Sequence, residues 1–475
     1  MVASGAIVLG GGVPAASGLA ADVVPADVRG QLLWYAGDGW GRFDELQAQG
    51  ADGEGITIAV IDTAINLDVP ELAGADIEVM GNYCADEVTG KAHDAVSDDL
   101  ALAEHGTNAV SMLVGNGTAG DGGLGTRGIA PAAKVLFYAI GGAPDQGGDC
   151  GVFDPRTGEA YADGTLIDDE GVPEIVSSPF QLAAMHAIED GAAVISASFS
   201  TGAVGWDAVM IRALRAGVIV VGATSNPSDV TDLSSGDAPA SMNGAVAVAG
   251  LTPEGTEYSH SVEILDDESR TVLGGGSPNL AGVAPATEIL LPASARTGTW
   301  GPSAGAGTSW ATPLVAGSLA LVRQKFPEAT ANQALQAMVR TTGDSEGELV
   351  WSSRLWGYGV IRPHAMLATD PTGYPDENPL FVSDVETDPR CLRDGELIHN
   401  QYGVDCAWSP YGPTQEEVTP PQGTPAAAPP QATGTIDLAG PLLIGGVVML
   451  VVVVVVIVVV AIVVRTNQRR ERESG

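Results

Sequence analysis

The stretch GITIAVID, residues 55–62, decides the fold of this 475-residue chain. It is a short apolar run rich in β-branched residues, which is typical of a strand buried on both faces of a parallel sheet. Similar runs stand at residues 134–140, 191–198, 217–224 and 244–251. Helical patterns lie between them, at residues 105–115, 178–191 and 207–217. Strands that alternate with helices predict an α/β fold, a doubly wound parallel sheet with helices on both faces.

The composition restricts the classes of partner that the chain can bind. Hydrophobic residues make up 45% of the chain, enough for a large core, and the formal net charge is −38. Nucleic acid is excluded as a partner because binding phosphates requires a basic surface. No CxxC spacing of a zinc cluster is present, and the acidic stretch at 86–99 lacks the spacing of a calcium loop. We expect no cofactor and no metal, and interpret 86–99 as a solvated loop, with calcium binding as the alternative.

Four polar side chains stand where a fold of this kind assembles an active site. Ligands bind such sheets at the carboxyl ends of the strands. Two of the four side chains follow a predicted strand, and the other two stand at predicted helix starts. The four are Asp62, Asn226, His105 and Ser309. A serine needs a base to take its proton, histidine titrates in the useful range, and a carboxylate fixes the tautomer of the histidine. A carboxamide and a backbone N–H at a helix start can stabilise an oxyanion.

Ser309 lies in GAGTSWATPLVAGSLALV, residues 305–322, where small residues precede a long apolar run. A serine at such a place is often a helix cap, and each of the other three has an ordinary reading as a turn or surface residue. Taken together, the four favour nucleophilic catalysis. Pro313 falls early in the predicted helix, where a missing N–H costs little.

Four blocks of the sequence resemble those of the subtilisin-like serine peptidases: VIDTAI (60–65), EHGTNAVSMLVG (104–115), GVIVVGATSN (217–226) and GTSWATPLVAG (307–317). Their order, Asp then His then Ser, is that of subtilisin. The resemblance implies a serine endopeptidase that hydrolyses peptide bonds through an acyl-enzyme. Ser309 would be the nucleophile, His105 the general base and Asp62 the carboxylate that orients the base. Asn226 would donate to the oxyanion.

The same resemblance implies that the segment ASFST, residues 197–201, binds the substrate through Ser198, Phe199 and Ser200. The chain departs from the family pattern elsewhere: Ala64 replaces a glycine, Trp310 a methionine and Leu314 a histidine. The methyl group of Ala64 is tolerated if φ is negative. Ser200 and Ser225 stand where glycines usually let the substrate approach, so we expect a shallow primary pocket that prefers small side chains.

The C-terminal end predicts a membrane anchor. Residues 442–464 form an uncharged run of 23 residues. As a helix this run spans about 34 Å, slightly more than the hydrocarbon core, and only a helix satisfies the backbone of a lone segment in lipid. Arginines crowd the residues that follow, which predicts a cytoplasmic C-terminus and an extracellular body.

The remaining segments complete the predicted organisation. Small residues near Gly18 and Ala20 suit signal-peptide cleavage although a basic start is absent, and a disordered leader is the alternative. A stretch rich in proline, threonine and alanine before the anchor indicates a semi-rigid tether. We expect a signal peptide at 1–20, an N-terminal extension at 21–54 in which residues 31–50 pack on the body as a clasp, a peptidase domain at 55–375, a polar Pro-rich linker at 376–437, a transmembrane helix at 438–464 and a basic tail at 465–475.

Four cysteines allow three pairings in an exported protein. We favour Cys84–Cys150 and Cys391–Cys406, because the second pair closes a short polar segment of its own. Four unpaired thiols are the alternative.

The short N-terminal extension, the two disulfides, the Pro-rich tether and the C-terminal membrane helix together resemble the mycosins, membrane-anchored subtilases of actinobacterial type VII secretion systems. This resemblance implies a single-pass protein of the cell membrane with an outward-facing catalytic domain. Its partners would be a peptide or protein substrate, the lipid bilayer and a secretion complex. The alternative is a scaffold of the same fold that stabilises such a complex with little proteolysis. A peptide-binding or adhesion module is a third interpretation, against which the intact set of four site residues argues.

Overall fold

The structure is a computed structural model. It describes residues 24–141, 150–161, 165–167, 173–175, 178–201, 205–224, 226, 238–258, 279–294, 297–343, 346–347, 349–353, 355–384, 392–393, 396–397, 399–400, 403–404 and 412–419. The predicted signal peptide and the predicted transmembrane helix lie outside these residues. Within them, no helix is both long and apolar enough to cross a bilayer.

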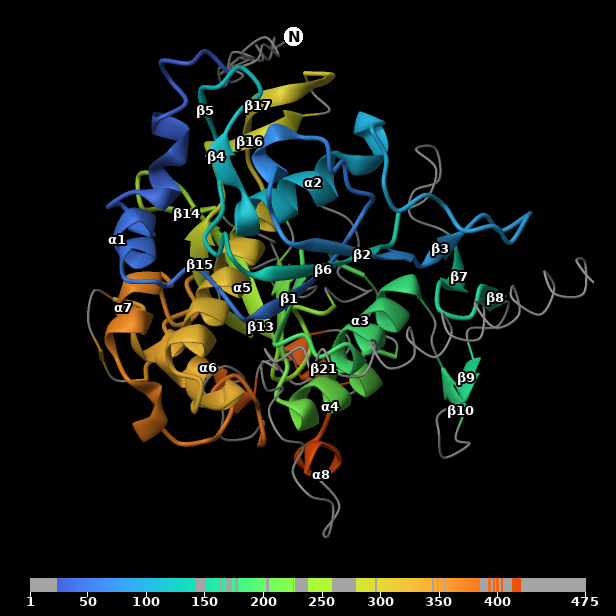
Figure 1. The fold of residues 1–475 in the computed structure, drawn as a ribbon. Helices are drawn as coiled ribbons and strands as arrows, with labels where there is room; N and C mark the ends of the chain where they lie inside the picture. The colour runs from blue at the N-terminus through green and yellow to red at the C-terminus, as the bar shows by residue number, and fades with distance from the viewer. Residues whose placement is uncertain are drawn as a thin grey trace, which may run out of the picture. The chain divides into compact units, whose positions relative to one another are not determined.

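A central sheet of eight strands organises the body (Figure 1). In spatial order its main path runs through β14 (Glu257–Tyr258), β13 (Val246–Leu251), β12 (Ile219–Ala223), β11 (Val194–Ala197), β1 (Thr57–Asp62), β6 (Lys134–Ala139) and β2 (Ile77–Asn82). The eighth strand, β15 (Leu280–Pro285), pairs with β13. All of these pairings are parallel except that of β14 with β13. Each of the five runs predicted as strands forms a strand of this sheet.

Helices cover both faces of the sheet (Figure 1). Alternate residues of a strand point to opposite faces, so β1 divides its side chains between two apolar clusters. Ile58 and Val60 belong to the cluster that contains the buried faces of α2 (Leu100–Val114) and α5 (Thr308–Lys325). Ala59 and Ile61 belong to the cluster that contains those of α3 (Pro179–Glu189) and α4 (Trp206–Ala216). The predicted doubly wound α/β fold is therefore confirmed.

One helix begins earlier than predicted. Residues 105–115 are expected to form a helix with His105 at its start, but α2 begins at Leu100. Asp99 caps it by accepting the N–H of Ala101 at 2.9 Å, because a short carboxylate is a good partner for the unpaired first donors of a helix. His105 consequently lies in the second turn of α2, and the expectation of a helix start there is wrong.

The remaining elements are short or peripheral. The helices are η1 (Gln31–Ala36), α1 (Phe43–Ala48), η2 (Pro70–Leu72), α6 (Ala331–Arg340), α7 (Pro363–Ala368), η3 (Pro371–Gly373) and α8 (Gln415–Val418). The two- and three-stranded ribbons pair β3 (Cys84–Ala85) with β7 (Gly151–Asp154) and β8 (Glu159–Tyr161), β4 (Asn116–Thr118) with β5 (Leu124–Arg127), β9 (Thr165–Ile167) with β10 (Pro173–Ile175), β16 (Ile289–Ser294) with β17 (Thr299–Gly305), β18 (Leu392–Arg393) with β19 (Glu396–Leu397) and β20 (His399–Asn400) with β21 (Gly403–Val404).

The segment expected to act as a clasp, residues 31–50, packs onto the body. Tyr35, Trp40 and Phe43 are almost completely buried in the cluster that also contains α2 and α5. The backbone N–H of Val24 donates to the carbonyl of Pro302 at 2.8 Å. The indole N–H of Trp34 donates to the carbonyl of Thr287 at 3.1 Å. The N-terminal extension is thereby bound to β17 through Val24 and to the residues just before β16 through Trp34, and this hairpin leads into α5.

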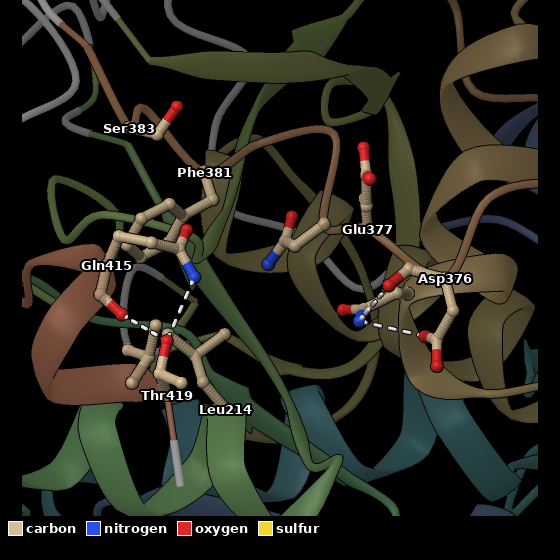
Figure 2. Close-up of a pocket in the computed structure, with 10 residues that line it drawn as sticks. Leu214, Asp376, Glu377, Phe381, Ser383, Gln415 and Thr419 are labelled. Carbon is tan, nitrogen blue, oxygen red and sulfur yellow. Dashed lines mark hydrogen bonds between the residues drawn. The ribbon is translucent and has the colours of Figure 1, made fainter.

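Part of the stretch expected to be a tether also contacts the body. The side-chain amide of Asn243 donates to the carbonyls of Val382 and Pro413, at 3.0 and 3.1 Å. A cavity of about 600 Å³ lies between α4, the start of α6 and this stretch. Figure 2 shows Gln415 and Thr419 on one side of the cavity and Asp376 and Glu377 on the other. None of the residues predicted to form the catalytic site lines it.

Candidate active site

Asp62 is the last residue of β1, at the carboxyl edge of the sheet. Its side chain is only 2% exposed. One carboxylate oxygen, Oδ1, accepts the backbone N–H of Thr63 at 2.8 Å and lies 2.7 Å from Nδ1 of His105. A buried carboxylate at this distance holds Nδ1 as the protonated nitrogen, which leaves Nε2 as the basic one. This is the tautomer that a general base requires.

The position of His105 depends on a close approach of α2 to the end of β1. Gly106 allows it, since a Cβ at that position would lie 2.6 Å from the carbonyl oxygen of Ala64. The N–H of Gly106 also donates to the hydroxyl of Thr63 at 3.0 Å. Ala64 itself is buried and does not have a positive φ, so the methyl group that departs from the family pattern is accommodated.

The pKa of the His105 imidazole lies above its ordinary value. Burial lowers this pKa, but the charge and hydrogen bond of Asp62 raise it, and the charge of Glu104 adds to the rise. The imidazolium is thus stabilised in the site where a proton taken from a nucleophile would be held.

Ser309 is the second residue of α5 and exchanges two hydrogen bonds with Ser198. Its hydroxyl donates to the carbonyl of Ser198 at 3.2 Å, and the hydroxyl of Ser198 donates to the carbonyl of Ser309 at 2.9 Å. The second bond has a cause in Pro313. In a helix the N–H of residue 313 would bond to the carbonyl of residue 309, and proline has none. The N–H that Pro313 lacks is thus replaced by the hydroxyl of Ser198, which satisfies the carbonyl of Ser309.

Asn226 lies beside the start of α5. Its carboxamide oxygen accepts the backbone N–H of Thr308 at 2.9 Å and the hydroxyl of Thr308 at 3.2 Å. That hydroxyl also lies 2.5 Å from the carbonyl of Thr224, so its single proton is shared between the two acceptors. The two bonds fix the orientation of the carboxamide, so that its NH₂ group faces away from Thr308.

The three residues predicted to bind substrate have different surroundings. Ser198 is buried and bonded to Ser309, as described above. Phe199 is half-buried and its ring packs on that of Phe180, with centroids 4.1 Å apart. Ser200 is exposed. Ser225 lies outside the described residues.

The sequence does not by itself show that Thr63 and Thr308 position the site, although both stand inside the blocks that resemble the family. Each is next to a predicted catalytic residue, and each bonds to a side chain or backbone group that positions the site. A threonine beside a catalytic residue, with a hydroxyl that can bond to backbone, is the signal that was available.

A disulfide joins Cys84 to Cys150, with the Cα atoms 5.4 Å apart, as predicted for this pair. Cys391 and Cys406 lie outside the described residues, so their pairing stays a prediction. In the described part of the chain, no group of three or more His, Cys, Asp or Glu side chains gathers closely enough to hold a metal ion.

Comparisons with known proteins identify the family of the chain. Residues 53–359 match the sequence profile of the subtilase family, peptidase S8. Mycosin-1 from Mycobacterium tuberculosis (strain ATCC 25618 / H37Rv) is 28% identical over 353 residues, which cover 67% of this chain and 70% of that protein. Subtilisin E from Bacillus subtilis (strain 168) is 26% identical over 322 residues, which cover 67% of this chain and 68% of that protein.

Among solved structures, fervidolysin from Fervidobacterium pennivorans, a keratinolytic enzyme related to subtilisin, aligns with a TM-score of 0.44 and 21% identity. The alignment covers 69% of this chain and 44% of that one. The match to the family profile extends over more than half of the chain. The chain therefore belongs to the subtilase family and is a subtilisin-like serine endopeptidase.

Proposed function

We propose that the chain cleaves peptide bonds with Ser309 as nucleophile, His105 as general base and Asp62 as the carboxylate that orients it. The observation that carries this proposal is the 2.7 Å bond between Asp62 Oδ1 and His105 Nδ1, beside the helix that carries Ser309 as its second residue. It leaves the basic nitrogen of the imidazole for the substrate side. Helices α2 and α5, which carry His105 and Ser309, pack against each other.

The chemistry follows from these positions. Ser309 Oγ attacks the scissile carbonyl carbon while His105 Nε2 takes its proton. The C–N bond then breaks, the imidazolium gives the proton to the departing amine, and an acyl-enzyme remains. Water attacks the acyl group with His105 again as base, which releases the acid and restores Ser309. In the structure the hydroxyl donates to the Ser198 carbonyl, so the attack requires that this proton be directed to His105 instead.

The oxyanion of each tetrahedral intermediate needs donors. The NH₂ group of Asn226 and the backbone N–H of Ser309 supply them in this proposal, because Thr308 fixes the Asn226 carboxamide by its oxygen side. Donors that are held in place before the reaction need no reorganisation as charge develops.

A fluorophosphonate probe tests the proposal. The folded full-length chain should be labelled, and Ser309→Ala should abolish labelling. Ser318→Ala is the matched control: it also removes a buried hydroxyl from α5, one that donates to the carbonyl of Leu314 at 2.7 Å, and it should leave labelling intact. Labelling that survives in Ser309→Ala would refute the assignment, and a folded but unlabelled wild type would favour the scaffold function.

The proposal extends to location. The sequence of residues 438–464 and the similarity to Mycosin-1 support a single-pass anchor with the peptidase outside the cell and a link to type VII secretion. Protease added to intact cells should digest the body and spare a tag placed after residue 475. A tag digested from outside, or a body that is protected, would contradict this topology.

A further inference from the structure

The residue that follows the proposed nucleophile contacts the proposed base. The indole of Trp310 packs on the imidazole of His105, with ring centroids 5.1 Å apart and planes inclined by 38°. Trp310 is 7% exposed, and the side chain of His105 is 36% exposed. The indole therefore covers part of the imidazole from the side of α5, while Asp62 holds it from the sheet.

The indole is held there by packing and not by a hydrogen bond. Its N–H is buried and has no hydrogen-bond partner among the described residues. Leaving such a donor unpaired is unfavourable, so another interaction fixes the ring. The loop before α5 is shaped around it: a Cβ at Gly305 would lie 3.2 Å from the indole nitrogen, and one at Gly307 would lie 3.5 Å from it.

The charges around His105 determine how the contact with Trp310 affects the imidazole. Asp62 on β1 and Glu104 on α2 both favour the imidazolium, and burial opposes it. A tryptophan ring attracts a cation placed near its face, more strongly than any other side chain. A ring at this position therefore acts on the charged form of His105, which forms when the base takes a proton from the nucleophile or from acidic solvent.

We propose that Trp310 is a positioning residue for the base, whose indole holds the His105 imidazole against Asp62 and stabilises the imidazolium during the reaction. This role rests on the proposed function, since it needs His105 as the general base. It assigns a purpose to a position at which the chain departs from the family pattern.

The pH profile of kcat/KM tests the proposal. A ring–cation attraction of ordinary strength corresponds to about 0.4 to 0.7 pH units, so Trp310→Met should move the acid limb down by that amount. It should also lower kcat about two- to fivefold with KM unchanged. Trp310→Phe keeps a ring face, so its acid limb and its kcat should lie close to those of the wild type. Trp356→Met, which removes an indole that makes no ring contact with His105, is the control.

The direction of the shift separates the proposal from a purely structural role. If the indole acted only by burying His105, its removal would raise the acid limb instead. An acid limb that rises or stays in place in Trp310→Met, or equal profiles for the Met and Phe variants, would overturn the proposal. Trp310→Leu replaces Trp310→Met if the latter does not fold.

A second measurement does not depend on activity. In a Ser309→Ala background, NMR titration of the full-length chain labelled on histidine nitrogen follows the pKa of His105, assigned by its loss in His105→Gln. Trp310→Met should lower this pKa by the same amount. A wild type without activity but with this shift would refute the proposed function alone, whereas an unshifted His105 would refute the role of Trp310.

Discussion

The carbonyl of Ser309 offers a quantitative test of how the nucleophile is held. Pro313 supplies no N–H to it, and the hydroxyl of Ser198, 3% exposed, donates to it at 2.9 Å. Ser198→Ala leaves this buried carbonyl without its donor, which costs about 1 to 3 kcal/mol of unfolding free energy. Pro313→Ala restores the helical N–H. In that background Ser198→Ala should therefore lower the unfolding free energy by at least about 1 kcal/mol less than it does with proline at position 313.

Denaturant unfolding of the four members of this cycle measures the coupling. A Ser309→Ala background prevents self-cleavage and keeps the carbonyl in place. Ser318→Ala is again the control, because its hydroxyl donates to the carbonyl of Leu314, which keeps its own helical N–H. Its cost should be smaller than that of Ser198→Ala and independent of Pro313. Equal costs of Ser198→Ala with proline and with alanine at 313 would refute the reasoning.

Four further outcomes are expected. Gly106→Ala places a Cβ 2.6 Å from the Ala64 carbonyl and should lower kcat/KM at least tenfold by moving His105, whereas Gly373→Ala, with open space around it, should match wild type in the same assay. The raised pKa of His105 means that activity falls with decreasing pH through a midpoint above the ordinary histidine value of about 6.5, because the protonated imidazole cannot act as base. Asp62→Asn should lower that midpoint and reduce kcat by about 10⁴ in pH–rate profiles; an unchanged midpoint would argue against the Asp62–His105 pair. A peptide library should show a preference for small side chains in the primary pocket, and a preference for large aromatic ones would contradict the shallow pocket.

The sequence alone was sufficient to predict the strands of the central sheet and the residues at which they end. β1 is a continuous apolar run that closes on Asp62, and such a run has few alternatives to a strand buried on both faces. The start of α2 was missed because the acidic residues before Leu100 were assigned to a solvated loop. Asp99 in fact ends that loop and caps the helix.

Interactions between distant segments could not be predicted from the sequence. The hydrogen bond from Ser198 to the carbonyl of Ser309 is one example. It depends on the donor that Pro313 lacks and on the packing of α5 next to β11. The contact of Trp310 with His105 likewise requires the relative placement of two helices. Neither spacing nor residue type specifies which side chain will fill such a place.

The strand order explains why these residues meet. The chain leaves β1 toward β2 and β6 on one side, then crosses to β11, β12 and β13 on the other, so the order reverses between β1 and β11. In doubly wound sheets the crevice at such a reversal is where ligands bind, because the connections on its two sides run to opposite faces. Asp62 ends β1, Ser198 follows β11, and Asn226 follows β12, all at the same edge of parallel strands. Since α2 and α5 pack on one face of these strands, His105 and Ser309, the proposed base and nucleophile, reach this edge from the same side. The meeting of these residues is thus a consequence of where the strand order reverses, and local features at Gly106 and Pro313 adjust their positions.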